Sequence, residues 1–411
     1  MMQERFDGSF TQQEPIPDEG IAAALAVLQH GRLHRYNTAP GEIAETALLE
    51  EEFAAQMGAK YALAVASGGY ALGCALRALG VQAGEPVLTN AFTLAPVPGA
   101  IAALGAKPVF VEVTESLVLD LADLEAKALA SGAKVLMLSH MRGHLVDMPA
   151  LMAVCARHGI RVIEDCAHTM GAAWDGTPSG RWGVVGCYSM QTYKHANSGE
   201  GGLMVSDDAE VMARAVLLSG SYMLYGKHRA SPPEEVFERV KYVTPNVSGR
   251  MDNLRAAILR PQMRGLAERV ARWNARYLVL EVGLCDVPGL RLIERPSAES
   301  YVGSSFQFLL PGWSGARVSA MLTRTAARGV ELKWFGAAQP MAFTSRYQHW
   351  RYAEPQSLPQ SDAILAGLID MRVPLTFSEA DCAQIARIIR QEVLAVGQGP
   401  EPAGVELPAI Q

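Results

Sequence analysis

The chain has 411 residues, of which 49% are hydrophobic and 19% charged, and its formal net charge is −6 at pH 7. This length favours two domains, while the mildly acidic charge and scattered Lys and Arg argue against a nucleic-acid partner. Residues 1–20 lack the basic start and apolar core of a signal peptide, and no apolar run reaches the roughly 20 residues of a membrane span, so we expect a cytoplasmic protein without a membrane partner.

The first part of the chain alternates short apolar runs with Ala/Leu-rich segments of helical spacing. The runs are YALAVAS from 61, EPVLTN from 85, KPVFVEV from 107, KVLMLSH from 134 and IRVIEDC from 160. This alternation predicts an α/β fold with a mostly parallel sheet sandwiched by helices.

The spacing changes after residue 182. The runs WGVVGCYSM from 182 and GGLMVSDD from 201 predict two more strands, which brings the sheet to seven, with a polar, glycine-bearing loop between them. An amphipathic segment over 253–283 predicts one long helix. Strand-like RLIERP, SSFQFLLP and VELKWF and a helical segment over 378–396 then predict a smaller α+β domain. We expect a large domain over 1–255, a small domain over 256–398 and a loose tail over 399–411.

Asp165 is the first residue that indicates chemistry. It ends the apolar run IRVIED, and open parallel sheets bind ligands at the carboxyl ends of their strands. A carboxylate there is costly to bury unless a cation or a hydrogen-bond donor meets it. Two interpretations stay open, a ligand-binding carboxylate and a carboxylate that caps the following turn.

Lys194 follows a predicted strand end at Ser189 by five residues, and the glycine-rich SGEGG follows from 198. Viewed alone, Lys194 is an ordinary solvated lysine. Together these residues suit a phosphorylated aldehyde cofactor, because the serine hydroxyl and backbone amides can hold the phosphate while the amine reaches the aldehyde. The glycine turn at Gly68 and Gly69, ahead of a predicted helix, is a second candidate anion site.

The sequence offers little for a metal site. The six cysteines lie far apart, and no pair has CxxC spacing. His140 and His144 have the i, i+4 spacing of a helical metal pair, but Gly143 and the strand-like run before them argue against a helix. We therefore expect no metal.

Six motifs taken together identify a family. They are SGGYAL from 67, AFT from 91, SHMRGH from 139, EDCAH from 164, YSMQTYK from 188 and SGEGG from 198. In order and spacing they resemble the DegT/StrS family of sugar aminotransferases, which depend on pyridoxal 5'-phosphate (PLP) and have PLP fold type I. Gly69 departs from the family pattern, which has a threonine there.

The resemblance implies a role for each matching residue. Lys194 forms the Schiff base with PLP, Asp165 pairs with the protonated pyridine nitrogen, and His168 lies near the ring hydroxyl. The remaining cofactor contacts are the phosphate ligands Gly68, Gly69 and Ser189 and the residue that covers one ring face, Phe92. Asn246 matches an asparagine that each subunit of a family dimer contributes to the phosphate site of the other subunit. We therefore expect a homodimer whose active sites are shared across the interface.

The resemblance also implies the reaction, the transfer of an amino group from glutamate or glutamine to a keto or aldehyde sugar. The runs SHMRGHLVDM and TYKHANSGEGG resemble the branch that aminates C8 of an oxidised 3-deoxy-octulosonate for lipopolysaccharide. Alternatives are a nucleotide-linked keto-hexose, a cyclitol of the scyllo-inosose type, and a PLP-dependent sugar dehydratase, which would need a histidine such as His195 at the lysine position. The candidate substrate contacts are Arg35, Tyr36, His140, Arg142 and Tyr193.

Overall fold

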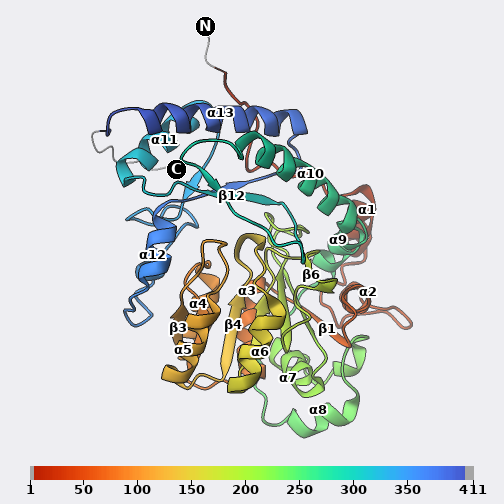
Figure 1. Ribbon diagram of the computed structural model, residues 1–411. Helices are drawn as coiled ribbons and strands as arrows, with labels where there is room; N and C mark the ends of the chain where they lie inside the picture. Colours follow the sequence, from red (N-terminus) through yellow and green to blue (C-terminus); the bar gives the residue numbers. More distant parts are fainter. Residues whose placement is uncertain (1–3, 403–411) are drawn as a thin grey trace.

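The computed structural model describes residues 4–402, and its largest element is a seven-stranded sheet (Figure 1). The strands are β1 (Tyr61–Val65), β2 (Pro86–Asn90), β3 (Lys107–Val111), β4 (Val135–Ser139), β5 (Arg161–Asp165), β8 (Val185–Ser189) and β9 (Gly202–Ser206). Their order is β1-β9-β8-β5-β4-β2-β3, and only β9 runs antiparallel to its neighbours. The predicted mostly parallel seven-stranded sheet is confirmed.

Helices cover both faces of this sheet. One face carries α3 (Gly68–Ala78), α4 (Pro96–Ala103) and α7 (Ala209–Ser219), and the other carries α2 (Glu45–Met57), α5 (Leu121–Ser131), α6 (Met148–His158) and α9 (Asn253–Arg264). In β1, Leu63 joins the apolar cluster under α3, while Ala62 and Ala64 join the one under α2. This alternation along the strand is what buries both faces.

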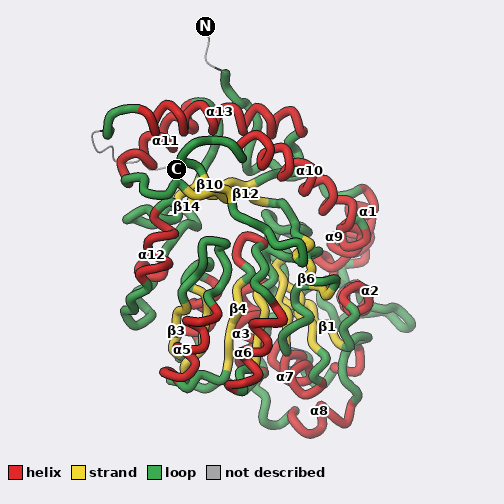
Figure 2. Tube along the Cα trace, in the orientation of Figure 1, coloured by secondary structure: helices red, strands yellow, loops and turns green. Residues whose placement is uncertain are grey.

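A second, antiparallel sheet lies above one end of the large sheet (Figure 2). Its strands, in spatial order, are β10 (Arg291–Leu292), β12 (Ser305–Leu309), β14 (Leu368–Arg372) and β13 (Lys333–Trp334). The helices near it are α10 (Leu266–Leu284), α11 (Gly315–Ala327), α12 (Pro359–Ala366) and α13 (Glu379–Gln398). A smaller α+β unit is thus present, whereas the domain boundaries at 255 and 398 stay predictions.

The remaining elements are peripheral. They are the helices α1 (Asp18–His30) and α8 (Glu234–Val240) and a small sheet of β6 (Ala173–Trp174), β7 (Thr177–Pro178) and β11 (Glu299–Ser300). Within residues 4–402, no helix is long and apolar enough to cross a membrane. Most of the predicted loose tail, from 403 onward, lies outside the described residues.

The structure corrects one predicted element. The single helix expected over 253–283 is two helices, because α9 ends at Arg264 and α10 begins at Leu266. Pro261 lies inside α9, lacks the amide hydrogen for a helical bond and crowds the preceding turn. Gly265, with φ of −87° and ψ of 8°, lies outside the helical range and separates α9 from α10, while the amphipathic pattern continues across it.

Candidate active site

Strands β1, β5 and β8 run parallel to one another, so their carboxyl ends meet at one edge of the sheet. This edge holds a cavity of about 80 Å³. Its lining residues are Gly68, Gly69, Leu72, Leu94, Pro96, Val97, Met141, Asp165, Ala167, His168, Ser189 and Lys194. Six of the predicted site residues are among them, and we call this space the cofactor cavity.

One wall of the cofactor cavity suits a phosphate group. Ser67 caps α3 by accepting a hydrogen bond from the Tyr70 amide at 3.0 Å, and the first amides of the helix have no intrahelical acceptor. A Cβ atom on Gly68 would lie 2.7 Å from the Ser189 Cβ, and one on Gly202 would lie 2.4 Å from the Ser67 carbonyl oxygen. Bare backbone at both glycines therefore lets the turn, the end of β8 and the start of β9 close around an anion.

Lys194 lies in the loop after β8, and its Nζ is 2.8 Å from the His168 Nε2. Burial, reinforced by the positive charges of Arg142 and Arg372, lowers the pKa of Lys194 to about 7, although Asp165 opposes the shift. Burial and the Lys194 charge also hold the pKa of His168 well below its usual value. A neutral His168 can accept a hydrogen bond from Lys194, whose amine is in part neutral near pH 7 and able to attack a carbonyl.

Asp165 ends β5 and is 8% exposed. Its carboxylate accepts hydrogen bonds from the Ser139 hydroxyl at 3.1 Å and the Ala167 amide at 3.2 Å, and the Thr93 hydroxyl donates to Ser139 at 2.8 Å. Burial raises the pKa of Asp165, while the Lys194 charge and these hydrogen bonds oppose the rise. A carboxylate held this way is ready to meet a cation such as a protonated pyridine nitrogen.

A larger cavity, of about 360 Å³, shares Lys194 and His168 with the cofactor cavity. Arg142 and Tyr193, both predicted substrate contacts, line it, and so does Arg372 from β14. The shared residues place Lys194 where the two spaces meet. We call the larger space the substrate cavity.

Four predicted site residues lie in the protein core, and one of them is His140, which is 1% exposed and bonds Glu164. Phe92 is 1% exposed and meets Phe335 edge to face with ring centroids 5.0 Å apart. Arg35 pairs with Glu50 at 2.8 Å, and Tyr36 shares a hydrogen bond with a buried histidine. None of the four is among the described residues that line either cavity, so the structure gives no support to the contacts expected of them.

Asn246 lies on the surface instead. It is exposed, and its Oδ1 is 3.1 Å from where a Cβ on Gly220 would be, beyond the end of α7. It lines neither cavity of its own chain within the described residues. Its contact with a neighbouring subunit's phosphate stays a prediction.

Arg372 is the residue that sequence reasoning missed. It ends β14, whose sequence LIDMR carries two charges in five residues and does not match an apolar strand. Its place opposite Lys194 depends on how the second sheet sits over the first. A pattern confined to one segment could not have revealed it.

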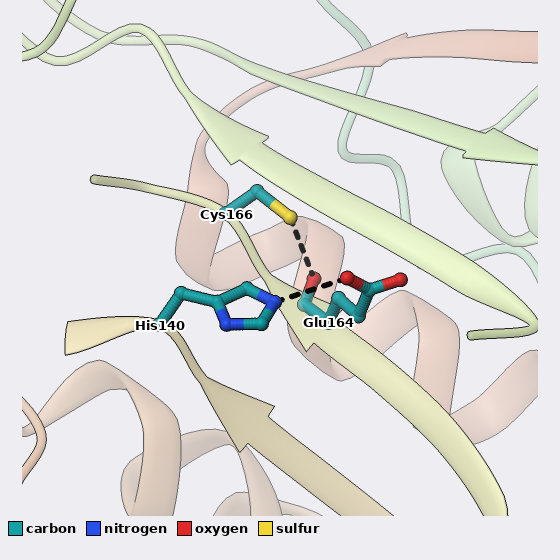
Figure 3. A group of neighbouring side chains, drawn as sticks. All are labelled: His140, Glu164 and Cys166. Atoms are coloured by element: carbon teal, nitrogen blue, oxygen red, sulfur yellow. Dashed lines mark hydrogen bonds and ion pairs between the residues drawn. The ribbon is translucent and has the colours of Figure 1, made fainter. Parts of the chain in front are cut away.

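His140, Glu164 and Cys166 form a buried cluster with atoms close enough to hold a metal ion (Figure 3). Four donors already occupy the Glu164 carboxylate: the His140 ring at 3.0 Å and the amides of Gly180 at 2.8 Å, Trp182 at 2.8 Å and Gly183 at 2.6 Å. An ionised carboxylate has about four acceptor positions. The cluster therefore orders the loop between β7 and β8 rather than forming an open ligand set.

Glu164→Gln is expected to lower the free energy of unfolding by about 2–4 kcal/mol, because an amide group would face N–H donors in a buried place. Urea denaturation measures the loss. Glu51→Gln, which breaks an exposed pair with Arg229, is the control and should cost less than about 1 kcal/mol. Incubation with EDTA should leave the Tm of the wild type unchanged, and a Tm that falls would instead indicate a bound metal.

Comparison with known proteins gives consistent results. The profile of the DegT/DnrJ/EryC1/StrS aminotransferase family matches residues 16–390. A putative L-glutamine:3-amino-2,3-dideoxy-scyllo-inosose aminotransferase of Micromonospora echinospora is 31% identical over 287 residues, 69% of this chain and 66% of that protein. A UDP-N-acetyl-3-dehydro-alpha-D-glucosamine 3-aminotransferase of Acidithiobacillus ferrooxidans is 33% identical over 298 residues, 68% of this chain and 75% of that protein. The crystal structure of 3-amino-5-hydroxybenzoic acid synthase has a TM-score of 0.79 and 27% identity, covering 94% of this chain and 98% of that one.

The family profile covers most of the chain, and the residues that line the cavity at the sheet edge have the chemistry that the family's cofactor needs. PLP carries a phosphate, a pyridine nitrogen and an aldehyde on one ring. The cofactor cavity offers a partner for each of them, namely the glycine turn at Gly68 for the phosphate, the Asp165 carboxylate for the nitrogen and the Lys194 amine for the aldehyde. The chain belongs to the DegT/DnrJ/EryC1/StrS aminotransferase family and is a PLP-dependent aminotransferase.

Proposed function

We propose that the protein transfers an amino group from glutamate or glutamine to the carbonyl carbon of a keto or aldehyde sugar. The observation that carries this proposal is the position of Lys194, which lines both the cofactor cavity and the substrate cavity. An amine in that position can react with a cofactor on one side and handle a proton of a substrate on the other.

Three side chains divide the work. PLP, when bound, supplies a ring that takes up the electrons of a substrate carbon as its proton leaves. Asp165 would keep the ring nitrogen protonated, because its negatively charged carboxylate is held in position by a hydrogen bond from the Ser139 hydroxyl. Lys194 holds the migrating proton on Nζ, and His168, 2.8 Å away, keeps that Nζ in place.

We rank a C8-oxidised 3-deoxy-octulosonate, an intermediate for lipopolysaccharide, first among acceptors, and a nucleotide-linked keto-hexose second. The relative named for a UDP-linked 3-dehydro-glucosamine supports the hexose. The relative named for an amino-dideoxy-scyllo-inosose supports a cyclitol as the alternative class. Glutamate and glutamine are both retained as donors.

The dehydratase alternative needs a histidine in the place of Lys194, and His195 is the residue next to it. The His195 Nε2 bonds the Ser304 hydroxyl at 2.9 Å, and its ring packs against Trp273. His195 lines only the substrate cavity. These contacts favour Lys194 as the residue that reaches the cofactor, and so they favour amino transfer.

We also propose that the enzyme is a homodimer with shared active sites. Support comes from exposed apolar side chains around Asn246, namely Tyr242, which is 86% exposed, Val243 at 69% and Val247 at 44%. Burying such side chains against a second copy would remove a cluster of apolar surface from water. Sedimentation should give twice the chain mass, and a monomer with full activity would contradict the proposal.

The proposed reaction is tested in two halves by the visible spectrum of the PLP-loaded protein. Glutamate or glutamine should bleach the yellow absorbance, and the correct keto or aldehyde sugar should restore it. A panel of neutral cyclitols, nucleotide-linked keto-hexoses and keto-sugar acids identifies the acceptor. Failure of every amino donor to bleach the absorbance would contradict the proposal.

The reactivity of Lys194 should depend on pH with a midpoint near 7, since its pKa lies at about 7 and only the neutral amine reacts. Trace acetylation with acetic anhydride, read by mass spectrometry in protein freed of PLP, should rise between pH 6 and 8 and then level off. Arg372→Gln should move the midpoint upward, because it removes a nearby positive charge, whereas Arg214→Gln on α7 should not. A wild-type rate that still climbs steeply above pH 9 would contradict this prediction.

A further inference from the structure

Four arginines line the substrate cavity, namely Arg142, Arg269, Arg272 and Arg372, and two of them act on Lys194. Arg142 and Arg372 both line this cavity, and the Arg142 side chain is only 6% exposed. Each lowers the pKa of Lys194, which places both in electrostatic range of the reacting amine. Keeping like charges together in a partly buried space costs free energy unless an anion joins them.

The two arginines that act on Lys194 differ in their carboxylate contacts, and the carboxylates Glu14 and Glu268 that also line the cavity form no ion pair with either of them among residues 4–402. Asp370 lies 2.8 Å from the Arg142 Nη2, and its other oxygen accepts a hydrogen bond from the Gln307 amide at 2.7 Å. Among residues 4–402, the Arg142 Nε and Nη2 have no aligned hydrogen-bond partner, and no carboxylate lies within 4.0 Å of Arg372. Among the described residues, Arg372 is therefore left without a carboxylate in contact, while Arg142 shares Asp370 with Gln307.

The surroundings hold both guanidinium groups in fixed positions. The Arg372 Cζ lies 3.6 Å from the centroid of the Tyr193 ring, and the Arg142 Cζ lies 4.8 Å from that of Phe343. Arg372 is also 5.5 Å from the Phe343 centroid, so the two arginines share one aromatic neighbour. Arg142 has a backbone φ of 57°, a left-handed conformation that is costly for a residue other than glycine. Both observations indicate side chains placed in advance of a ligand.

We propose that Arg142 and Arg372 form a carboxylate-binding site for the substrate, on the side of Lys194 away from the glycine turn at Gly68 that suits a phosphate. A guanidinium group recognises a carboxylate through paired N–H donors, and two such groups can hold one carboxylate in a fixed orientation. The inference rests on the proposed amino transfer. The carboxylate comes either from the amino-acid donor or from a sugar acid that accepts the amino group.

Glutarate, a dicarboxylate with no amino group, tests the site without turnover. Calorimetry on the PLP-loaded protein should show that Arg372→Gln weakens glutarate binding roughly 10- to 100-fold, as expected for a lost charge-assisted hydrogen-bond pair. Arg372→Lys, which keeps the charge, should lose less. Arg214→Gln removes a positive charge on α7, away from both cavities, and should bind as the wild type does. Circular dichroism establishes that each variant is folded.

The two half-reactions identify where the carboxylate comes from. If Arg372→Gln raises the KM for glutamine in the first half-reaction, the carboxylate belongs to the donor. If Arg372→Gln raises the KM for a keto-sugar acid in the second half-reaction, but not the KM for the carboxamide of that sugar, the carboxylate belongs to the acceptor. Glutarate affinity and both KM values within twofold of wild type in a folded Arg372→Gln protein would overturn the site. A wild type that transfers no amino group from any donor would overturn the proposed function instead, while glutarate binding would still test the arginine pair.

Discussion

Lys194→Ala should lower kcat about 10³-fold or more, because it removes both the amine that reacts with PLP and the group that moves the proton. Borohydride treatment of the PLP-loaded wild type should fix the cofactor to the chain, and mass spectrometry should locate it on Lys194. The variant should bind PLP without such fixation. Stability should change little or rise, since burial disfavours the Lys194 charge and the amine already has a pKa of about 7.

Lys134→Ala is the matched control, because Lys134 is exposed and its Nζ donates to the His158 carbonyl oxygen, away from both cavities. That variant should keep wild-type turnover and fixation. Full turnover by Lys194→Ala would remove Lys194 from the mechanism. Fixation on any other lysine would have the same consequence.

Asp165→Asn should lower kcat by about 10²- to 10³-fold, the loss typical of removing one electrostatic contact to the reacting system. The amide cannot keep a cation at the ring nitrogen, so the ring would withdraw electrons less strongly. The bleaching of the PLP absorbance by glutamate follows this step directly. Asp286→Asn, which breaks an exposed pair with Arg390, should bleach at the wild-type rate.

The stability of Asp165→Asn separates a functional role from a structural one. Burial raises the pKa of Asp165 in the folded chain. A carboxyl group with a raised folded pKa disfavours folding above its unfolded pKa, so at pH 7 its charge is a cost. Urea denaturation of the PLP-free variant at pH 7 should therefore show equal or higher stability than wild type. A less stable variant would mean that the carboxylate holds the fold together.

The sequence predicted the large sheet well, because each of its strands is a compact apolar run followed by a turn. It also predicted which residues meet at the sheet edge. Asp165, Ser189 and Lys194 stand at strand ends or at short distances from them, and parallel strands bring their ends together whatever the details of packing. For these three residues, the local sequence pattern and the strand topology both predict a place at the edge of the sheet.

Other features depend on packing between segments that are distant in the chain. Phe92 occupies the core because Phe335 comes to meet it, and Arg35 is buried because Glu50 neutralises its charge. Arg372 enters the substrate cavity only because β14 lies inside the second sheet between β12 and β13. The sequence around Phe92 or Arg35 does not indicate which distant residue it will contact.

The central claim is that the amino group passes from an amino-acid donor, by way of the site at Lys194, to a sugar carbonyl. The most direct measurement uses glutamate and glutamine labelled with ¹⁵N at the α-amino group and the acceptor identified by the panel. Mass spectrometry should find one ¹⁵N atom in the sugar product for each donor consumed, with the wild type and not with Lys194→Ala. A sugar product that has lost water and carries no ¹⁵N would contradict the account and point to a dehydratase.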